Sequence, residues 1–306
     1  TTAYRVRPDV LLFELFPFGR RRLRFEIDPL LEHARAAGPR PLVVSSMRDI
    51  LVTPSKAGRV EEIVELVAKH FDLVLIHGDP TFIPFDSTFP AAVQIADRLR
   101  YTGYVVEPPA MGSDGATGLG EVLVSAGSGA VSERIFEAAL EARALSRLAD
   151  VPWRALVGHS LPEASFRRLR RRAPDGLIVE RARPDFASLL AVCRLSISQG
   201  GYNTVMEVLQ AGAPCVTVPF AGGIETEQTL RCRLLARRGV LQMVAEDSLS
   251  PDRLAAAVAA ALDGPAASAA GIATDGLECS TALVLEALRA HRATAFAAPA
   301  PSRQIG

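Results

Sequence analysis

The chain has 306 residues, which allows roughly two domains of about 150 residues each. Hydrophobic residues make up 49% of it, enough for buried cores, and its 34 basic residues balance 34 acidic ones. The zero formal net charge argues against a general nucleic-acid-binding protein, which usually carries a basic excess, but it leaves room for local basic patches.

Cysteine usage and targeting patterns narrow the class of protein further. The four cysteines form no C-x-x-C pair and no Cys/His cluster with zinc spacing; they are Cys193, Cys215, Cys232 and Cys279. The first two lie in apolar, strand-like surroundings, so we interpret them as small buried residues and expect a reducing, cytoplasmic compartment. The sequence has no apolar run near the roughly 20 residues that span a bilayer, and no signal peptide at its start. Because it begins without Met on the approach to a strand, we expect that residues upstream are missing.

The first part of the chain alternates short apolar runs with longer amphipathic stretches, which is typical of βα units and a parallel sheet. The strands expected there are Val10–Phe13, Leu42–Ser45, Leu73–His77 and Gly103–Val106, and the helices are Asp28–Ala37 and Arg59–His70. These strands are fewer than a Rossmann-like domain usually has. A stretch dense in Pro, Gly, Ser and Asp then indicates a domain boundary, so we predict a first domain over residues 1–108 and a linker over residues 109–120.

The second part repeats the pattern more regularly. Its expected strands are Val122–Ser125, Arg154–Val157, Leu177–Val179, Leu195–Ser198, Cys215–Val218 and Leu241–Val244. Its expected helices are Ser132–Ala149, Glu163–Arg172, Phe186–Val192, Thr204–Ala211, Glu227–Arg238, Pro251–Leu262 and Ser280–His291. Such a series of βα units makes a complete Rossmann-like domain, predicted over residues 121–291, and the Ala/Pro-rich residues 292–306 are predicted to form a disordered tail.

A glycine turn between a strand and a helix is the strongest functional pattern. The run Ser198–Glu207 (SQGGYNTVME) ends an apolar strand, turns at two glycines and starts a helix that Asn203 or Thr204 could cap. Glycines let a phosphate approach the backbone, and a helix N-terminus supplies N–H donors. Glu207, expected in the first helical turn, could accept hydrogen bonds from ribose hydroxyls. The alternative is an ordinary strand, turn and helix, in which an acidic residue near the N-terminus is common.

Two further loops have the same setting. Small residues fill the run Ser125–Gly129 (SAGSG), which suits a loop around a diphosphate, although a tight βα turn explains the pattern equally well. The run Pro219–Gln228 (PFAGGIETEQ) places Glu225, Glu227 and Gln228 between a strand and a helix, where they could accept hydrogen bonds from sugar hydroxyls. The alternative is a helix start favoured by its dipole.

The run from Ser198 to Gly239 resembles the donor-binding signature of GT-B glycosyltransferases. It is especially similar to the C-terminal domain of the MurG-type family, the N-acetylglucosaminyltransferases of peptidoglycan synthesis, because glycine turn, Glu, A-G-x-P, P-F loop and acidic-Gln pair follow in the same order and spacing. The resemblance implies that Glu207 contacts the ribose and that Arg183 lines the base. It implies that the phosphates and the donor sugar are contacted by the residues Gly127, Ser128, Gly129, Gln199, Gly200, Gly201, Asn203, Thr204, Glu227 and Gln228.

The whole chain, from about Pro8 to Arg289, is more similar still to a bacterial family described only as predicted glycosyltransferases. The first half carries this similarity in the runs ELFPFGR (14–20), SMRDI (46–50), HGDP (77–80) and YTGY (101–104). Two departures stand out. Gln199 occupies a position where many GT-B enzymes have His. The family's N-terminal glycine-rich loop, whose His is a candidate base in MurG-type enzymes, would lie upstream of Val10, so we expect a fragment with impaired catalysis.

Polar residues that follow strands of the first part are candidates for the acceptor side; they are Glu14, Arg48, Asp49, His77 and Asp79. A carboxylate or imidazole there could act as general base on an acceptor hydroxyl, and we favour Asp79 or His77. The commoner role of such a residue is a cap or a hydrogen-bond partner between domains. A basic cluster at residues 20–24 could meet a phosphorylated or lipid-linked acceptor, but a solvated charged turn is the more frequent explanation.

The sequence thus predicts an α/β protein of GT-B fold: two Rossmann-like domains with parallel sheets facing a cleft, the first domain incomplete. The predicted reaction moves a sugar from a nucleotide diphosphate sugar, by preference UDP-linked, to an acceptor hydroxyl. The MurG resemblance implies inversion. The sequence has no Asp-x-Asp motif, so neither a metal nor a cofactor is expected; peripheral membrane contact is compatible with it. Two alternatives stay open: a nucleotide-sugar hydrolase or epimerase of the same fold, and a non-catalytic nucleotide-sugar-binding protein.

Overall fold

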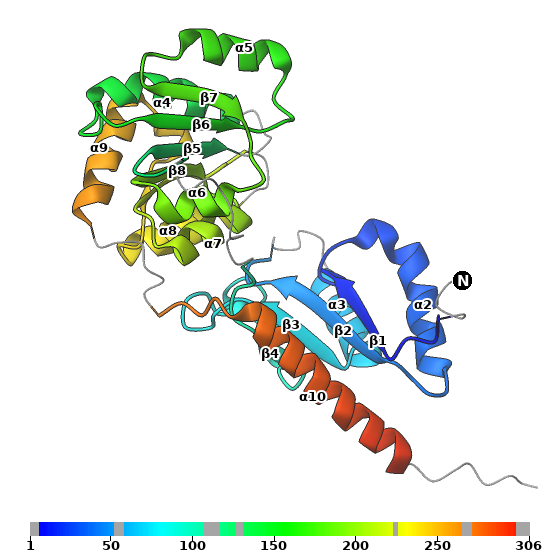
Figure 1. The fold of residues 1–306 in the computed structure, drawn as a ribbon. Helices are drawn as coiled ribbons and strands as arrows, with labels where there is room; N and C mark the ends of the chain where they lie inside the picture. Colours follow the sequence, from blue (N-terminus) through cyan, green and yellow to red (C-terminus); the bar gives the residue numbers. More distant parts are fainter. Residues whose placement is uncertain are drawn as a thin grey trace, which may run out of the picture. The chain divides into compact units, whose positions relative to one another are not determined.

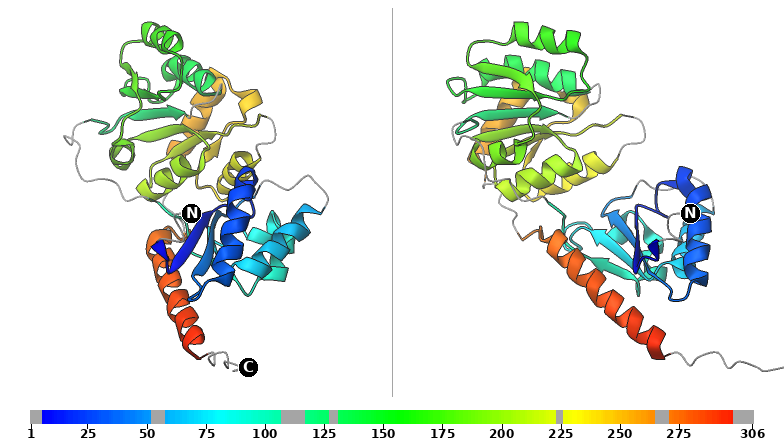
Figure 2. Two further views of the ribbon diagram at one scale, coloured as in Figure 1. Left: turned by 90° about the vertical axis from the view of Figure 1, so that its right-hand side faces the viewer. Right: turned by 45° about the vertical axis from the view of Figure 1, so that its right-hand side comes forward.

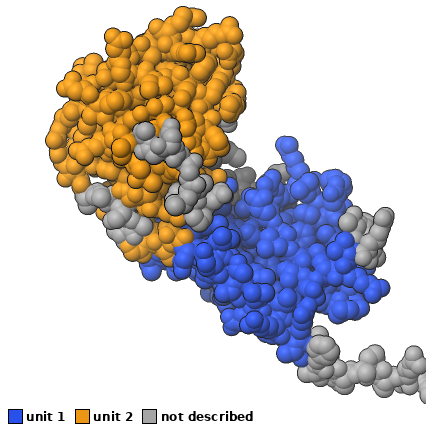
Figure 3. Space-filling model, viewed as in Figure 1, with its two compact units in different colours: residues 1–105, 275–306 blue, residues 106–274 orange. Residues whose placement is uncertain are grey.

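The computed structural model describes residues 6–51, 58–106, 117–126, 131–222, 226–264 and 271–297. The chain divides into two compact units, drawn in different colours in Figure 3. The first unit consists of residues 1–105 and 275–306, and the second of residues 106–274. The chain therefore leaves the first unit once and returns to it with its last helix.

The first unit is built on a four-stranded parallel sheet. Its strands follow one another in the order β1 (Val10–Glu14), β2 (Leu42–Arg48), β3 (Leu73–His77) and β4 (Leu99–Tyr101). Its other elements before residue 105 are η1 (Arg21–Leu23), α2 (Arg24–Ala36), α3 (Arg59–His70), η2 (Phe85–Ser87) and η3 (Pro90–Ile95). Because successive strand residues point to opposite faces, alternate residues such as Val43 and Met47 of β2 pack with α2 and α3 in one apolar cluster.

The last helix, α10 (Gly276–Ala297), covers the other face of this sheet, as both Figure 1 and Figure 2 show. One face of the helix packs on the second apolar row of β2 and β3; the cluster contains Leu42, Val44, Leu73, Leu75, Leu283, Val284, Ala287 and Leu288. The second domain boundary therefore differs from the prediction, which ended the second domain at residue 291 and began a tail at 292. The helix belongs to the first unit and continues to Ala297. Periodicity reveals an apolar helix face, but not which sheet that face will cover.

The second unit contains a six-stranded parallel sheet. Its strands are β5 (Val122–Ala126), β6 (Trp153–Val157), β7 (Leu177–Arg181), β8 (Leu195–Gln199), β9 (Cys215–Val218) and β10 (Gln242–Met243). Between them lie α4 (Val131–Leu145), α5 (Glu163–Arg172), α6 (Phe186–Val192), α7 (Tyr202–Ala211), α8 (Glu227–Arg237), η4 (Glu246–Ser248) and α9 (Pro251–Asp263). The order β10-β9-β8-β5-β6-β7 is that of a doubly wound sheet, with the first and fourth strands side by side in the middle.

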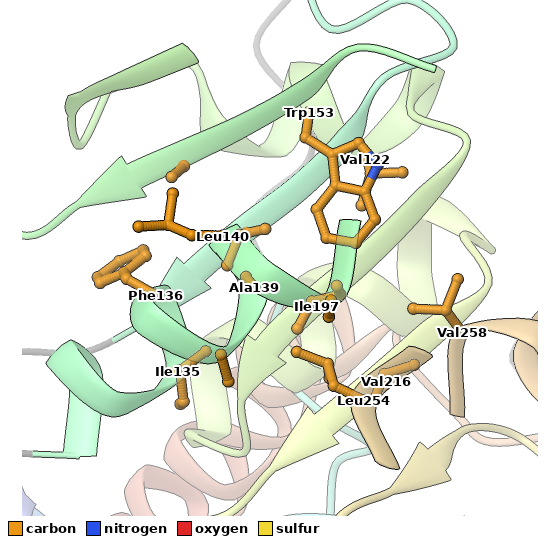
Figure 4. Close-up of a cluster of buried hydrophobic side chains, with 14 of the residues drawn as sticks. Val122, Ile135, Phe136, Ala139, Leu140, Trp153, Ile197, Val216, Leu254 and Val258 are labelled. Carbon is orange, nitrogen blue, oxygen red and sulfur yellow. The ribbon is translucent and has the colours of Figure 1, made fainter. Parts of the chain in front are cut away.

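The core of the second unit lies between this sheet and the helices α4 and α9 (Figure 4). Trp153 is wholly buried there, and its indole N–H donates to the carbonyl of Leu148 at 3.0 Å. Phe136 and Ile135 of α4 and Val258 of α9 reach the same cluster. This apolar layer holds the strands rigidly and so positions the loops at their carboxyl ends.

Most predicted elements agree with the structure to within a few residues, and the fourth strand differs most. It was predicted over Gly103–Val106 but lies at Leu99–Tyr101. Gly103 has a φ of 79°, a left-handed conformation that no strand continues through. Tyr104 and Val106 after it are buried, but Val105 makes only an isolated β-bridge with Asp275, so this apolar run is not a strand of the sheet.

Candidate functional site

The sheet of the second unit has a topological switch point between β5 and β8. From β5 the chain winds outward to β6 and β7, whereas from β8 it winds to β9 and β10. In an open α/β sheet, ligands bind beyond the carboxyl ends of the strands at such a point. The two glycine loops singled out in the sequence follow these two strands. Gly127, Ser128 and Gly129 of the first loop lie outside the described residues.

The end of β5 contributes a buried hydroxyl to this place. Ser125 lies beside Ser198 in the register of β5 and β8. Its Oγ atom is buried and has no hydrogen-bond partner among the described residues. Because a buried hydroxyl without a partner costs stability, Ser125 is a candidate contact for a ligand. The sequence placed Ser125 in the motif but gave no reason to single out its side chain.

The two glycines after β8 are glycines for different reasons. A Cβ atom on Gly200 would lie 2.4 Å from Sγ of Cys232 and 3.2 Å from Cβ of Pro219, so packing excludes a side chain there. Gly201 has a φ of −65°, which any residue adopts, and no described atom lies within 4 Å of the position of its Cβ. The Gly201 N–H donates to the carbonyl of Gln199 at 2.8 Å, but the open space beside Gly201 lets a ligand approach the turn and the start of the following helix.

The helix after this turn begins earlier than predicted. Gly201 is the N-cap of α7 and, lacking a side chain, it caps no N–H group. Asn203 and Thr204 lie within the first turn instead of capping it, and Glu207, the sixth residue of the helix, lies in the second turn instead of the first. The uncapped N–H groups of the first turn can therefore bind an anion.

Gln199 and Gln228 are brought together by the fold. Nε2 of Gln199 donates to Oε1 of Gln228 at 3.4 Å, and the backbone N–H of Phe220 donates to the same oxygen at 3.1 Å. Because a backbone N–H can only donate, the Gln228 oxygen must face it, which fixes the orientation of the amide. This oxygen is thus engaged within the protein, and the expected role of Gln228 as an acceptor for sugar hydroxyls does not fit. Its NH₂ group suits a donor role.

Glu227, the first residue of α8, forms an ion pair with Arg231 one turn later, at 3.0 Å between Oε1 and Nη1. Arg231 is wholly buried, and its guanidinium lies 4.9 Å from the ring centroid of Tyr202, the first residue of α7. A buried cation requires such compensation. Through its contacts with Glu227 and Tyr202, Arg231 links the start of α8 to the start of α7. Arg231 was not predicted from the sequence as a site residue, because one arginine in an arginine-rich helix gives no sign that it is buried.

Arg183, the residue expected to line the base, follows β7. Its guanidinium makes two hydrogen bonds with the carboxylate of Asp185, at 2.9 and 2.7 Å. The hydrogen bond between them lowers the pKa of Asp185 and raises the pKa of Arg183. Such a bidentate pair fixes the plane of the guanidinium next to the start of α6, and a fixed plane of this kind can stack on an aromatic ring.

At the carboxyl edge of the first sheet, the fold brings His77 into contact with two hydroxyls. His77 ends β3; its Nε2 lies 2.7 Å from Oγ of Ser46 in β2, and its Nδ1 lies 3.0 Å from Oγ1 of Thr102, just after β4. Burial lowers the pKa of His77, so the imidazole is neutral at neutral pH and can take up a proton. His77 was predicted from the sequence as a candidate base, whereas neither Ser46 nor Thr102 was predicted as its partner.

Asp79, the other candidate base, has a local structural role. Its side chain is buried, and Oδ1 accepts hydrogen bonds from the backbone N–H and the hydroxyl of Thr81, at 2.8 and 2.6 Å. Side-chain bonds of this kind stabilise a turn. Asp49 is buried as well and accepts a hydrogen bond from the Tyr104 hydroxyl at 2.6 Å. The geometry therefore favours His77 over Asp79 as an acceptor of a proton.

Three arginines of the basic cluster at residues 20–24 are paired with nearby carboxylates. The pairs are Arg20–Glu14, Arg21–Glu62, Arg24–Glu62 and Arg24–Asp28. The hydrogen bond from Arg24 lowers the pKa of Glu62. This pairing supports the interpretation of the cluster as a charged turn.

In the described part of the chain, no group of three or more His, Cys, Asp or Glu residues could hold a metal ion. No helix within that part is long and apolar enough to cross a membrane. The four cysteines are free thiols.

Comparison with protein families gives one match. The profile of the glycosyltransferase family 28 C-terminal domain matches residues 123–275, half of the chain's 306 residues. This range covers the second unit almost completely.

Relatives with matching sequence include two proteins named UDP-N-acetylglucosamine–N-acetylmuramyl-(pentapeptide) pyrophosphoryl-undecaprenol N-acetylglucosamine transferase. The protein from Mesorhizobium japonicum is 34% identical over 95 residues, which are 30% of this chain and 25% of the relative. The protein from Phenylobacterium zucineum is 31% identical over 120 residues, 38% of this chain and 33% of the relative. The chain thus matches a third or less of the length of these relatives.

Solved structures match over both units. CalG4, the calicheamicin glycosyltransferase, has a TM-score of 0.62 at 19% identity and covers 95% of this chain and 75% of its own. MurG from Acinetobacter baumannii has a TM-score of 0.59 at 18% identity, covering 93% and 76%. A protein from Listeria monocytogenes described as a proposed UDP-N-acetylglucosamine 2-epimerase has a TM-score of 0.61 at 14% identity, covering 96% and 77%. These likenesses show the fold, which is that of GT-B glycosyltransferases.

Proposed function

Because the chain belongs to the family of the glycosyltransferase family 28 C-terminal domain, we propose that it transfers a sugar from a nucleotide diphosphate sugar to an acceptor hydroxyl. One observation carries this proposal: the uncapped glycine turn at Gly200 and Gly201 follows β8 at the switch point of the second sheet. Backbone N–H groups and a helix N-terminus at that point suit a diphosphate.

The donor in this proposal is UDP-linked. The relatives from Mesorhizobium japonicum and Phenylobacterium zucineum are named as transferases that use UDP-N-acetylglucosamine, which supports UDP over other nucleotides. Glu207 in α7 accepts hydrogen bonds from the ribose, and the fixed guanidinium of Arg183 lines the base. The Gln228 NH₂ group donates to the donor sugar, because the Gln228 oxygen is already engaged with Phe220 and Gln199.

The departing diphosphate is stabilised by backbone groups. Negative charge grows on its oxygens as the bond to the anomeric carbon breaks, and the N–H groups at the start of α7 face that charge without having to reorganise. We propose that this happens without a metal ion and with inversion at the anomeric carbon. The proton of the acceptor hydroxyl goes to a base, for which His77 is the better candidate than Asp79.

The test is binding of UDP, compared with GDP, CDP and dTDP, measured by calorimetry on the whole chain. We expect selective binding of UDP and a loss of about tenfold or more in affinity for Glu207→Ala, since one hydrogen-bonded carboxylate contributes about 1.5–3 kcal/mol. Gln210→Ala, an exposed position on the same helix, is the matched control and should bind as the wild type does. Equal affinity for all four nucleotides, or an unaffected Glu207→Ala variant, would contradict the proposed donor site.

The Listeria protein gives a specific reason to keep a second candidate function. Its fold similarity equals that of the glycosyltransferases, so the same architecture also suits a UDP-sugar epimerase. Product analysis separates the two. Incubation with UDP-N-acetylglucosamine and an acceptor yields UDP and a new glycoside if the chain is a transferase, UDP and free sugar if it is a hydrolase, and a second UDP-sugar if it is an epimerase.

A further inference from the structure

We propose that Ser46, His77 and Thr102 form a proton relay that takes the proton of an acceptor hydroxyl bound at Ser46. This inference deepens the proposed transferase function and rests on it. Ser46 touches the acceptor and is the catalytic residue at the entrance of the relay, whereas Thr102 is a positioning residue that acts through His77. The three side chains come from segments that are far apart in the sequence, so the relay exists only in the folded first unit.

The relay lies where two neighbouring strand rows change from apolar to polar residues, one step later on β3 than on β2. On β2 the row runs Leu42, Val44, Ser46, and the first two pack under α10. On β3 the neighbouring row ends at His77 after two leucines in the same cluster. The parallel register pairs Ser46 with Leu75 and Arg48 with His77, so the serine and the histidine are diagonal neighbours on one face. Both are half-buried, at the edge where α/β sheets bind ligands.

The neighbours of the Thr102 hydroxyl determine in which direction its hydrogen bonds run. Its hydroxyl has a single proton, and Oγ1 lies 2.6 Å from the carbonyl oxygen of Gly103 and 3.4 Å from that of Ile76. A carbonyl oxygen can only accept, so the threonine proton goes to a carbonyl and Thr102 must accept from His77. The proton of the neutral imidazole is therefore on Nδ1.

This tautomer leaves a lone pair on Nε2, which faces Ser46. At 2.7 Å, the Ser46 hydroxyl donates its proton to Nε2, and the lone pairs of its oxygen can accept a further hydrogen bond. Thr102 is 2% exposed, so it is the buried end of the row of three hydrogen-bonded side chains. Since Ser46 covers the basic nitrogen, an incoming hydroxyl meets the serine oxygen first.

The proposed step moves two protons in one direction. The acceptor O–H proton passes to Oγ of Ser46 while the Ser46 proton passes to Nε2 of His77. The acceptor oxygen forms its bond to the anomeric carbon, and the bond from that carbon to the diphosphate breaks, with the electron pair leaving on the phosphate oxygen. The serine ends the step unchanged, and the imidazolium donates from Nδ1 to Thr102. Release of the glycoside lets the imidazolium return its proton to water.

The direction of the relay is tested first, by long-range proton–nitrogen NMR on protein labelled with ¹⁵N-histidine. His77→Gln identifies the His77 signals among those of the five histidines. We expect the Nδ1–H tautomer in the wild type, its retention in Thr102→Ser, and a change to the Nε2–H tautomer in Thr102→Val, where Ser46 becomes the acceptor. An Nε2–H tautomer in the wild type would overturn the relay irrespective of any activity.

The catalytic role is tested by product formation from UDP-N-acetylglucosamine over a panel of hydroxyl acceptors that begins with glycerol. We expect kcat to fall about 10²–10⁴-fold in His77→Gln, the range for loss of a general base, and less in Ser46→Ala, with the donor KM unchanged and activity restored by Ser46→Thr. Ser87→Ala, an exposed serine of the same unit, is the control for unspecific effects. A Ser46→Ala variant with wild-type kcat would overturn the role of the serine.

The pH profile separates a relay from a merely structural contact. Burial lowers the pKa of His77 below its ordinary 6.5, so kcat should fall with acid at a midpoint below that value. The charged residues at this edge are Glu14, Arg48, Asp49 and Asp79, and burial is the cause of the lowered pKa of His77, so the midpoint should disappear in His77→Gln. A midpoint that persists in His77→Gln, or a profile that is flat through this range, would overturn the assignment to His77. A chain that binds UDP but yields no product with any acceptor would overturn the transferase function and this role together, while the tautomer would still decide the hydrogen-bond direction.

Discussion

The carboxyl edges of the two sheets present different chemical groups. In the second unit, β8 leads through a glycine turn into α7, whose first backbone N–H groups have no side-chain cap because the N-cap residue is Gly201. In the first unit, β2 and β3 end in side chains, and the hydroxyl of Ser46 meets the imidazole of His77. An edge of backbone groups suits a phosphate, which carries charge in many directions. An edge of side chains suits one proton, because each hydrogen bond has a direction.

The strongest test of the backbone edge is Gly200→Ala. A Cβ there would lie 2.4 Å from Sγ of the buried Cys232 and 3.3 Å from the backbone Cα of Pro219, so the turn and its packing must shift. We expect a loss of about 1–3 kcal/mol in the free energy of unfolding, as for other overpacked cores, and loss of UDP binding. Denaturant titration and calorimetry on the same samples measure both. Normal binding in a stable Gly200→Ala variant would show that the shape of the turn is not needed.

Removal of the Asp79 carboxylate tests whether this residue is structural. Asp79→Ala loses the two hydrogen bonds to Thr81, and we expect a cost of about 1–2 kcal/mol in the free energy of unfolding. Asp79→Asn keeps an acceptor oxygen and should cost less. The His77 tautomer should be the same in both variants, which NMR can check. A His77 tautomer that changes in these variants would mean that Asp79 takes part in the relay, and it would weaken the comparison between the two edges.

Gly201→Ala sharpens the comparison, because it adds a methyl group where the protein has space. No described atom lies within 4 Å of the new Cβ, so the free energy of unfolding should be nearly unchanged. A ligand on the backbone would meet the methyl group, and we expect about tenfold weaker UDP binding, equal to about 1.4 kcal/mol. Calorimetric measurement of UDP binding by both variants distinguishes the two glycines. We expect that Gly200 is required by packing and Gly201 by the ligand.

The smallest effect expected is a pH dependence of stability. Burial lowers the pKa of His77 and of His70, so the unfolded chain takes up protons more readily than the folded one as the pH falls below 6.5. The stabilisation from neutral histidine is therefore complete above that pH and is lost as the pH falls through the lowered pKa. Denaturant titrations between about pH 8 and pH 5 should show a decline that is shallower in His77→Gln. A decline of the same slope would mean that burial of His77 does not favour its neutral form.

Much of the second unit could be predicted from the sequence. The helices Glu163–Arg172 and Phe186–Val192 and the strand Cys215–Val218 have the predicted bounds, because hydrophobic periodicity and length suffice for such elements. The glycine turn was predictable for a related reason. A backbone site depends on the absence of side chains at consecutive positions, and that absence is visible in a single stretch of sequence.

In the first unit, the contacts between candidate site residues could not be predicted from the sequence. The contact between Ser46 and His77 depends on which strands are neighbours and in which register they pair. The direction of the hydrogen bonds depends on Thr102, whose hydroxyl donates to a backbone carbonyl that the folded chain places beside it. Likewise, nothing local distinguishes Arg231, which is buried beside Tyr202, from the solvated arginines of α5.

The sequence alone determined the alternation of strands and helices, the place of the glycine turn and the resemblance to GT-B glycosyltransferases, because these are properties of residues close together in the chain. Only the tertiary structure decided which sheet α10 covers, which way the Gln228 amide points and which atoms of His77 have partners. The physical reason is that a hydrogen bond or a packed face needs two surfaces, and the second surface here comes from segments distant in the chain.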